Sequence, residues 1–437
     1  MANDWEVVSL VEHCKKIGSG ATPRGGSSVY LEEGEITLIR SQNVYNEGFK
    51  RDGLVFITEE AAEKLKNVIV EENDILLNIT GDSVARVCMV DNQVLPARVN
   101  QHVSIIRPKE SSFNPSYLRY QLVSPQVQQL LLNYASAGAT RHALTKSMIE
   151  NLGIPKPDLD TQNNIAHILG SLDDKIELNR QMNETLEAMA QTLFKSWFVD
   201  FDPVIDNALA AGNAIPDEFI ERAEQRKAIK EKDSSDIQAL FPDEFEFTEE
   251  MGWIPKGWEA GSLDNMFELQ RGFDLPKTKR TDGLYPLMAA SGQDGTHDEY
   301  KVKGPGVITG RSGKLGVVSF VNANYWPLNT TLWVKNYNQS NPYHAYFFLQ
   351  TLDLEKYNSG SAVPSLNRNN VHNLAQILPS KIVLDKFQEV VKSSFAKIAE
   401  NNTGIETVAK LRDTLLPKLM SGELRIPDAA ELVDEAI

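Results

Sequence analysis

The chain repeats itself, and this internal repeat constrains its fold more than any other feature. Six segments of the first half return in the same order in the second half, the later ones about 222 to 229 residues further on. Because ordered self-similarity of this kind marks a duplicated structural unit, the sequence predicts two copies of one unit. The pairs are Asp4–Leu10 with Gly257–Leu263, Asn78–Val90 with Val307–Val321, Val99–Val103 with Leu328–Leu332, Asn114–Leu122 with Asn341–Leu349, Ser136–Leu152 with Ser359–Leu374, and Glu184–Phe198 with Glu406–Met420.

Each copy reads as a mixed α/β block followed by a long helix. The block contains short β-branched runs broken by glycine turns, such as "DILLNIT" and "VARVCMV", which is typical of strands. In the helix, apolar residues recur at steps of three and four, so that one stripe faces a partner helix. Pro417 is expected to end the second helix. The residues expected to pair the helices are Ile165, Leu169, Leu172, Ile176, Leu186, Met189, Leu193, Phe395, Ile398, Ile405, Val408 and Leu415.

Two long helices with matching seams most simply pack on each other in antiparallel, coiled-coil-like fashion. The predicted fold is α+β, with two similar mixed α/β domains separated by these helices and related by a pseudo-twofold axis. At about 37 residues, the first helix would reach roughly 55 Å. The alternative is that each helix packs only on its own domain. The predicted segments are 1–158 (first domain), 159–200 (central helix), 201–252 (acidic helical linker), 253–380 (second domain) and 381–437 (C-terminal helix and tail).

The net charge of −16 is concentrated in one segment. Residues 201–252 carry 14 acidic and 5 basic side chains, whereas 1–158 has a net charge of −3 and 253–380 of +2. Each α/β block can therefore still present a local basic face to nucleic acid. The acidic segment would be repelled by phosphate, and we expect it to face protein partners or solvent.

Several kinds of chemistry are not supported by the sequence. "GRSGKLG" has Leu315 where a phosphate-binding P-loop needs Ser or Thr, and no G-x-G-x-x-G motif follows a strand. "NPSY" (Asn114–Tyr117) lacks the second proline of an adenine methyltransferase motif, so Asn114 is interpreted as a helix N-cap. Asp173-Asp174 is interpreted as a solvated helix face. We therefore expect no catalytic centre, no metal site and no cofactor in this chain.

The expected location is the cytoplasm, without contact to a membrane. No run of about 18 apolar residues is present, and the N-terminus lacks the pattern of a secretion signal. Two cysteines, Cys14 and Cys88, cannot build a disulfide framework.

The helical segments resemble those of a known family. "NNIAHILGSLDDKIELNRQMNETLEAMAQTLFKSWF" and "TLLPKLMSGELRIP" are similar to the two conserved helical regions of type I restriction–modification specificity (S) subunits. "SAGATRHALTKSMI" and "SGSAVPSLNRNNV" resemble the stretch that closes each target-recognition domain in that family, and "LFPDEFEFTEEMGWIPKGWE" resembles the link into the second one. Thr161-Gln162 departs slightly, because the family often has Glu-Gln there.

The resemblance implies a non-catalytic DNA reader. Each target-recognition domain would read one half of a bipartite, asymmetric site in double-stranded DNA. The helices would set the spacer and dock two modification subunits, which methylate adenine with S-adenosylmethionine. ATP-dependent restriction subunits would join them. A helix of roughly 55 Å exceeds one DNA turn of about 34 Å, so it could hold two half-sites about a turn apart.

Candidate DNA contacts are polar and basic residues at strand ends and glycine turns that recur in both copies with different identities. Arginine suits guanine, and asparagine or glutamine suits adenine. In the loop Gly306–Val318, Gly310 to Lys314 is aligned with Gly81 to Ala85. The first-domain candidates are Arg40, Ser41, Gln42, Asn43, Thr80, Asp82, Ser83, Arg86, Asn100, Gln101, His102, Thr140 and Arg141. The second-domain candidates are Ser291, Gln293, Thr309, Arg311, Ser312, Lys314, Asn329, Thr330 and Arg368.

Three alternatives remain open. A coiled-coil scaffold protein would explain the helices but not the paired glycine loops. A self-sufficient methyltransferase would need the cofactor loop that is missing here. A recognition subunit of a related, non-cleaving modification system would have the same sequence features.

Overall fold

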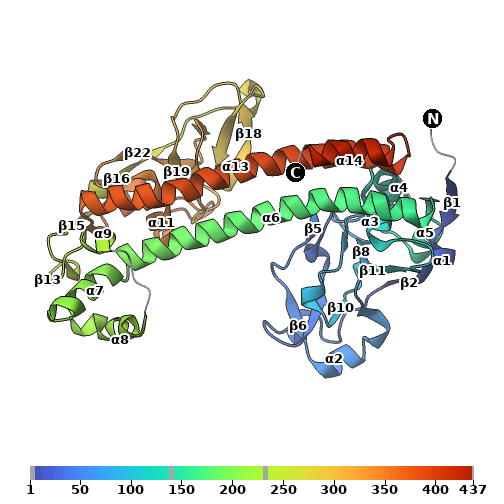
Figure 1. Cartoon of the computed structure of the whole chain (residues 1–437), viewed down its shortest axis with the longest axis horizontal. Helices are drawn as coiled ribbons and strands as arrows, with labels where there is room; N and C mark the ends of the chain where they lie inside the picture. The colour runs from blue at the N-terminus through green and yellow to red at the C-terminus, as the bar shows by residue number, and fades with distance from the viewer. Residues whose placement is uncertain (1–4, 137–141, 230–234, 436–437) are drawn as a thin grey trace. The chain divides into compact units, whose positions relative to one another are not determined.

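The computed structural model describes residues 5–136, 142–229 and 235–435 (Figure 1). The chain forms two compact units, Met1–Asn179 with Gly404–Ile437, and Arg180–Thr403. Two helices of 40 residues each, α6 (Leu159–Phe198, green in Figure 1) and α13 (Lys381–Met420, red), are both divided between the units. Each unit therefore contains one α/β domain and one half of each long helix, whereas the predicted segments set the long helices apart from the domains.

The first unit is built on two four-stranded sheets. Its strands are β1 (Glu6–Ser9), β2 (Cys14–Ser19), β3 (Ile36–Ile39), β4 (Val44–Tyr45), β5 (Gly48–Phe49), β6 (Val55–Ile57), β7 (Ile69–Val70), β8 (Ile75–Asn78), β9 (Val87–Met89), β10 (Ala97–Val99), β11 (Val103–Pro108) and β12 (Gly153–Lys156). Its shorter helices are α1 (Leu10–His13), α2 (Glu59–Glu63), α3 (Pro115–Val123), α4 (Pro125–Ser136), α5 (Lys146–Glu150) and α14 (Ile426–Asp434). The sheet β2-β11-β8-β9 is antiparallel, and the sheet β6-β3-β10-β7 contains one parallel pair, β3 with β10.

The second unit repeats this arrangement. Its strands are β13 (Phe245–Thr248), β14 (Gly252–Pro255), β15 (Glu259–Ser262), β16 (Phe267–Arg271), β17 (Tyr285–Ala289), β18 (Gly292–His297), β19 (Gly306–Gly310), β20 (Val318–Val321), β21 (Trp326–Pro327), β22 (Thr331–Tyr337) and β23 (Ala375–Leu378). Its shorter helices are α7 (Asp202–Ala211), α8 (Ile220–Ala228), α9 (Ser235–Gln238), α10 (Leu263–Met266), α11 (Pro342–Thr351) and α12 (Arg368–His372).

The sheet orders confirm the duplication predicted from sequence. The order β16-β22-β19-β20 corresponds to β2-β11-β8-β9, strand for strand. The second sheet, β18-β17-β21, contains one parallel pair, β17 with β21, in the place of β3 with β10. The antiparallel pair β15–β23 closes the second domain as β1–β12 closes the first.

The halves of the long helices pack on each other within each unit. In the first unit, Leu169, Leu172 and Ile176 of α6 share a core with Val408 and Leu415 of α13. In the second unit the shared core comes from the other half of each helix, through Ala190, Phe194, Phe387, Val391 and Phe395. Because the start of α6 meets the end of α13 and its end meets the start of α13, the helices run antiparallel, as predicted.

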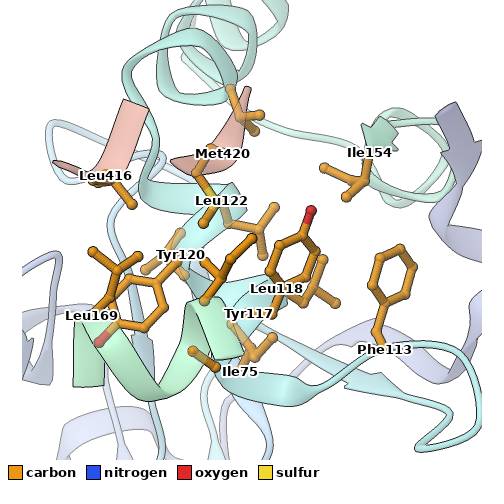
Figure 2. Close-up of a cluster of buried hydrophobic side chains, with 14 of the residues drawn as sticks. Ile75, Phe113, Tyr117, Leu118, Tyr120, Leu122, Ile154, Leu169, Leu416 and Met420 are labelled. Carbon is orange, nitrogen blue, oxygen red and sulfur yellow. The ribbon is translucent and has the colours of Figure 1, made fainter. Parts of the chain in front are cut away.

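The same cores include the α/β domains, so the alternative that each helix packs only on its own domain is wrong. Figure 2 shows Leu118 and Leu122 of α3 with Leu169 of α6 on one side and Met420 of α13 on another. Helix α3 begins at an Asn114 N-cap, whose side chain accepts a hydrogen bond from the Tyr117 backbone, and it has Pro115 in its first turn. The interpretation of "NPSY" as a helix start is thus confirmed.

Two details of the helix prediction are wrong. Met189 is 64% exposed, because the stripe in this half of α6 runs through Ala190, Phe194 and Trp197, one residue further along. Helix α13 continues through Pro417 to Met420. The proline lies in the last turn, where the apolar burial of Leu419 and Met420 offsets the one backbone hydrogen bond that proline cannot donate.

Asp173 is also not the solvated residue that was expected. Its carboxylate accepts hydrogen bonds from Arg119 Nη1 (3.1 Å), Tyr120 Oη (2.7 Å) and Arg412 Nη1 (2.8 Å). Burial, followed by the charge of Asp173, raises the pKa of Tyr120. Asp173 therefore joins α3, α6 and α13, whereas its neighbour Asp174 is exposed.

The acidic segment folds as the helices α7, α8 and α9 followed by the hairpin β13–β14. Two of its carboxylates serve inside the fold, because Arg222 forms a two-point ion pair with Asp202 (2.7 Å for each contact) and Arg226 pairs with buried Asp206. Among the described residues, no helix has the length and apolar character that crossing a membrane requires.

Candidate nucleic-acid interface

In each domain a glycine brings two loops into contact. Gly20 follows β2, and a Cβ at this position would lie 1.9 Å from the Val99 carbonyl oxygen. Gly272 follows β16, and a Cβ there would lie 2.2 Å from the Leu328 carbonyl oxygen. Only glycine allows this approach. Thr22 and Asp274 lie two positions after these glycines. They are therefore held beside the turn that precedes β11 in the first domain and β22 in the second.

The two turns are joined to these residues in the same way. Thr22 Oγ1 donates a hydrogen bond to Gln101 Oε1, and Asn329 Nδ2 donates one to Asp274 Oδ1. The backbone fixes the equivalence: Val103 N donates to Asn100 O (3.2 Å), and Thr331 N donates to Leu328 O (2.9 Å). Gln101 therefore corresponds to Asn329. The sequence alignment of Asn100 with Asn329 was wrong by one residue.

A second loop in each domain lies against the same turn, and it corrects the alignment further. Gly81 and Gly313 have positive φ angles of 77° and 93°. Thr80 therefore corresponds to Ser312, and Asp82 to Lys314, so the predicted alignment of Gly310 with Gly81 was wrong by three residues. Three backbone hydrogen bonds of the first domain each have a counterpart in the second. Ile79 N to His102 O matches Arg311 N to Thr330 O, and Leu144 N to Ile79 O matches Leu366 N to Arg311 O. Gly81 N to His142 O matches Gly313 N to Pro364 O.

In the first domain these loops carry a continuous chain of neutral polar side chains, the first polar edge, which consists of Thr22, Gln101, His102 and Thr80. His102 Nε2 lies 2.8 Å from Gln101 Nε2, and His102 Nδ1 lies 2.5 Å from Thr80 Oγ1. Because the glutamine amide nitrogen can only donate, Nε2 of His102 accepts and its Nδ1 donates to Thr80. Hydrogen bonds thus connect all four side chains of this edge.

The second polar edge consists of Asp274, Asn329 and Thr330, which correspond to Thr22, Gln101 and His102, together with the neighbouring Arg311. Arg311 Nη1 donates to the Asn329 carbonyl oxygen (3.1 Å). Asp274, Asn329 and Thr330 line a surface hollow of about 270 Å³. Thr330 Oγ1 is inaccessible to solvent and has no partner among the described residues. The polar side chains of Asp274 and Asn329 in the lining make the hollow suited to a polar ligand.

Other first-domain candidates lie on the loops after β3 and β8. Asn78 at the end of β8 donates to the Ser41 carbonyl oxygen (2.9 Å), which ties the loop after β3 to the loop after β8. Arg40 Nη2 donates to the Gly53 carbonyl oxygen (2.5 Å), as does Gln42 Nε2 (3.1 Å). The guanidinium of Arg86 lies 4.5 Å from the centre of the Tyr45 ring. Asp82 is exposed and Ser83 half-buried beside them.

Three candidates have internal roles instead, and the prediction that they face DNA is corrected. Asn43 is fully buried and donates to the Lys50 and Asp52 carbonyl oxygens. Asn100 is 6% exposed and accepts from the His102 backbone, and Thr309 is 1% exposed and donates to Val317 O. Asparagine and threonine at strand ends often satisfy the backbone, and sequence alone does not separate this role from DNA contact.

The remaining second-domain candidates lie at a hairpin, on a loop and at a helix start. Ser291 and Gln293 lie at the β17–β18 turn, and Ala289 and Asp294 of the same hairpin line the hollow. Lys314 is exposed. Arg368 begins α12 and donates to Leu269 O (3.3 Å). Thr140 and Arg141 lie outside the described residues.

Sequence reasoning missed Thr22, Asp274, Tyr45 and Lys50. The ammonium group of Lys50 lies 4.4 Å from the centre of the Tyr45 ring, the ring that Arg86 also contacts. Thr22 and Asp274 each lie two residues after a glycine that follows a strand, but the contact of that glycine with a distant turn is visible only in the structure. Among the described residues, no group of three or more His, Cys, Asp or Glu side chains could hold a metal ion.

Comparison with known proteins places both domains in one family. A family model described as "Type I restriction modification DNA specificity domain" matches residues 2–188 and 255–394. The chain is 28% identical to the type I restriction enzyme HindI specificity subunit of Haemophilus influenzae, over 97% of this chain and 100% of that protein. It is 27% identical to the MjaIX specificity subunit of Methanocaldococcus jannaschii, over 97% of this chain and 94% of that protein. A crystal structure of the type I restriction–modification S subunit from M. genitalium has a similar fold, with a TM-score of 0.55, 16% identity and 96% of each chain covered.

Proposed function

The chain belongs to the type I restriction–modification DNA specificity family, and we propose that it reads a bipartite, asymmetric site in double-stranded DNA for a modification and restriction complex. The observation that carries this proposal is the polar edge, which is built twice on the same backbone with different side chains. Thr22, Gln101 and His102 of the first domain are replaced by Asp274, Asn329 and Thr330 in the second. Two readers that share a frame and differ in side chains would read two different half-sites.

Tying the two readers to one helix pair supports the proposal energetically. Each domain alone would present only a small polar surface, and binding by one domain raises the effective concentration of the other at its half-site. The close approach of Gly20 and Gly272, which is the same in both domains, would hold the polar side chains of each edge in place before DNA binds. Less conformational entropy would then be lost on binding.

The proposed partners follow from the same reading. Two modification subunits would dock on the helical parts of the chain and carry S-adenosylmethionine, and restriction subunits would use ATP. This chain would contribute recognition only and have no catalytic centre. A methylation assay on the purified chain alone tests that point, because any transfer of a methyl group to DNA would contradict it.

The acidic segment is proposed to contact protein subunits rather than DNA. A surface hollow of about 710 Å³ there is lined by Asp217, Glu218 and Glu244 together with Phe245 and Trp253. A lining of carboxylates and aromatic side chains repels phosphate and favours a basic protein segment with an apolar anchor. DNA crosslinks concentrated between residues 201 and 252 would contradict this assignment.

The proposed function is tested with the assembled complex of this chain and its modification subunit. Methylation mapping in cells first identifies the site, and binding of the purified complex to that duplex is then measured between 50 and 200 mM salt. A recognition subunit gives tight, site-selective binding that weakens steeply with salt. Equal affinity for the mapped site and a scrambled duplex would favour a scaffold protein instead.

A further inference from the structure

We propose that one side-chain pair in each domain selects the identity of one base: Asp274 with Asn329 reads cytosine in the second half-site, and Thr22 with Gln101 reads adenine in the first. This inference rests on the proposed function and adds the specific contacts. The two pairs occupy the same place in the repeated fold, because Gly20 and Gly272 hold Thr22 and Asp274 against equivalent positions of equivalent turns.

The second-domain pair presents hydrogen-bond acceptors. The Asp274 carboxylate offers acceptors only, and the Asn329 amide nitrogen gives one of its two hydrogens to it. The side chain of Asp274 is 69% exposed, so its other lone pairs are open to a ligand. Asn329 and Thr330 lie beside it along the same hollow.

Among the four bases, cytosine matches this arrangement best. In the major groove, guanine presents two acceptors, and thymine presents an acceptor and a methyl group, so neither offers a donor to the carboxylate. Adenine offers its N6 amino group, but its N7 acceptor would lie beside the carboxylate charge, which disfavours adenine even where the second Asn329 N–H reaches N7. Cytosine presents its N4 amino group without a neighbouring acceptor.

A carboxylate close to DNA also has to overcome repulsion by phosphate, and its surroundings reduce that cost. Arg271 Nη2 lies 3.4 Å from Asp274 Oδ1, and the side chain of Arg271 is 52% exposed. Arg280, which also lines the hollow, forms an ion pair with Asp294 (2.8 Å). The acidic groups of this edge are thus accompanied by guanidinium groups that can face the DNA backbone.

The first-domain pair is neutral and presents both donors and acceptors. Gln101 accepts from Thr22 through Oε1 and points its Nε2 at His102. The second hydrogen on Nε2 and the remaining lone pair on Oε1 match the N7 acceptor and the N6 donor of adenine. The different chemistry of the two pairs gives the two half-sites different bases at equivalent positions of the reader.

The test uses the complete complex with its modification subunit and duplexes that vary one base pair at a time through both half-sites. For the wild-type complex, one cytosine of the second half-site should lose at least about tenfold in affinity when replaced. Asp274→Asn, which keeps the shape and converts one acceptor into a donor, should abolish that preference and leave every position of the first half-site unchanged. Asp282→Asn, another exposed aspartate of the second domain, is the matched control and should change nothing.

The reciprocal exchange extends the test to the first domain. The double variant Thr22→Asp with Gln101→Asn should shift one adenine of the first half-site towards cytosine, without effect on the second. The inference is overturned if Asp274→Asn leaves all base preferences unchanged, or if it lowers affinity equally for every duplex. A wild-type complex that does not distinguish its mapped site from scrambled DNA would instead refute the proposed function itself.

Discussion

Replacing Asp173 by asparagine tests how the first recognition domain is fixed to the helix pair. The carboxylate receives hydrogen bonds from Arg119, Tyr120 and Arg412, and the side chain of Arg119 is only 9% exposed. In the Asn variant, the amide NH₂ group takes the place of one carboxylate oxygen. It then faces either Arg119 and Tyr120 or the Arg412 guanidinium, all of which are donors. The negative charge that balances both arginines is also lost. Removing one partner of a buried pair typically costs about 3–5 kcal/mol. Since the Asp173 side chain is 27% exposed, solvent screening lowers the expected loss of unfolding free energy to about 2–3 kcal/mol.

The assay is urea unfolding of the full chain, followed by far-ultraviolet circular dichroism and by hydrogen exchange of the α3 amides, Pro115–Val123. Tryptophan fluorescence would report mainly on the other unit, because five of the six tryptophans lie between Arg180 and Thr403. Asp174→Asn removes the same charge one residue away on an exposed position, and it should change stability by no more than about 0.5 kcal/mol. If the two variants are equally stable, and exchange in α3 is not faster in Asp173→Asn, the reasoning is refuted.

Three further predictions follow from single features. Lys314→Ala should lower the slope of log affinity against log salt by about 0.9, the value for one lost phosphate contact. The control variant Lys381→Ala on α13 should leave the slope unchanged. An unchanged slope for Lys314→Ala would remove this lysine from the interface. Burial lowers the pKa of His344 to about 3, so the unfolded chain binds a proton below about pH 6.5 that the folded chain does not. The urea midpoint should therefore fall between pH 7 and pH 5, and it should fall less in His344→Phe. An equal fall in both proteins would show that His344 does not cause the loss of stability. The hollow lined by Asp217, Glu218 and Trp253 is tested by the triple variant Asp217→Lys, Glu218→Lys and Trp253→Ala, which should assemble more weakly with the modification subunit in sedimentation experiments. The control variant Glu249→Lys with Glu250→Lys should assemble normally. Equal assembly of both variants would contradict docking at this hollow.

The repeat, the strand-rich domains and the antiparallel helix pair could be predicted because each depends on a pattern that extends over many residues. Apolar steps of three and four identified Leu169, Leu172 and Val408, all of which are buried. The pattern failed at Met189, where two neighbouring stripes overlap and only packing decides which of them is buried. It also failed at Pro417, because the burial of Leu419 and Met420 offsets the backbone hydrogen bond that is lost at the proline.

The candidate interface was less predictable, because polar residues at strand ends serve both the backbone and ligands. The alignment of the shared letters Ile-Thr-Gly placed Thr309 opposite Thr80, but the hydrogen bonds of Gly81 and Gly313 show that Ser312 occupies that place. The glycine with positive φ determines the shape of the loop. It does not require the same amino acids at the preceding positions, so matching Ile-Thr-Gly in the two copies gives the wrong alignment. Thr22 and Asp274 were missed since their position depends on the close approach of Gly20 and Gly272 to a distant turn, which no local pattern reveals.

The central claim, that each domain reads one half-site, is tested most directly by exchanging a domain. Residues 4–155 are replaced by the corresponding segment of a family member with a known site, and DNA methylation is mapped in cells that contain the modification subunit. The account predicts a hybrid site in which only the first half changes, while the second half remains that of the original chain. A change in both halves, or in neither, would contradict it.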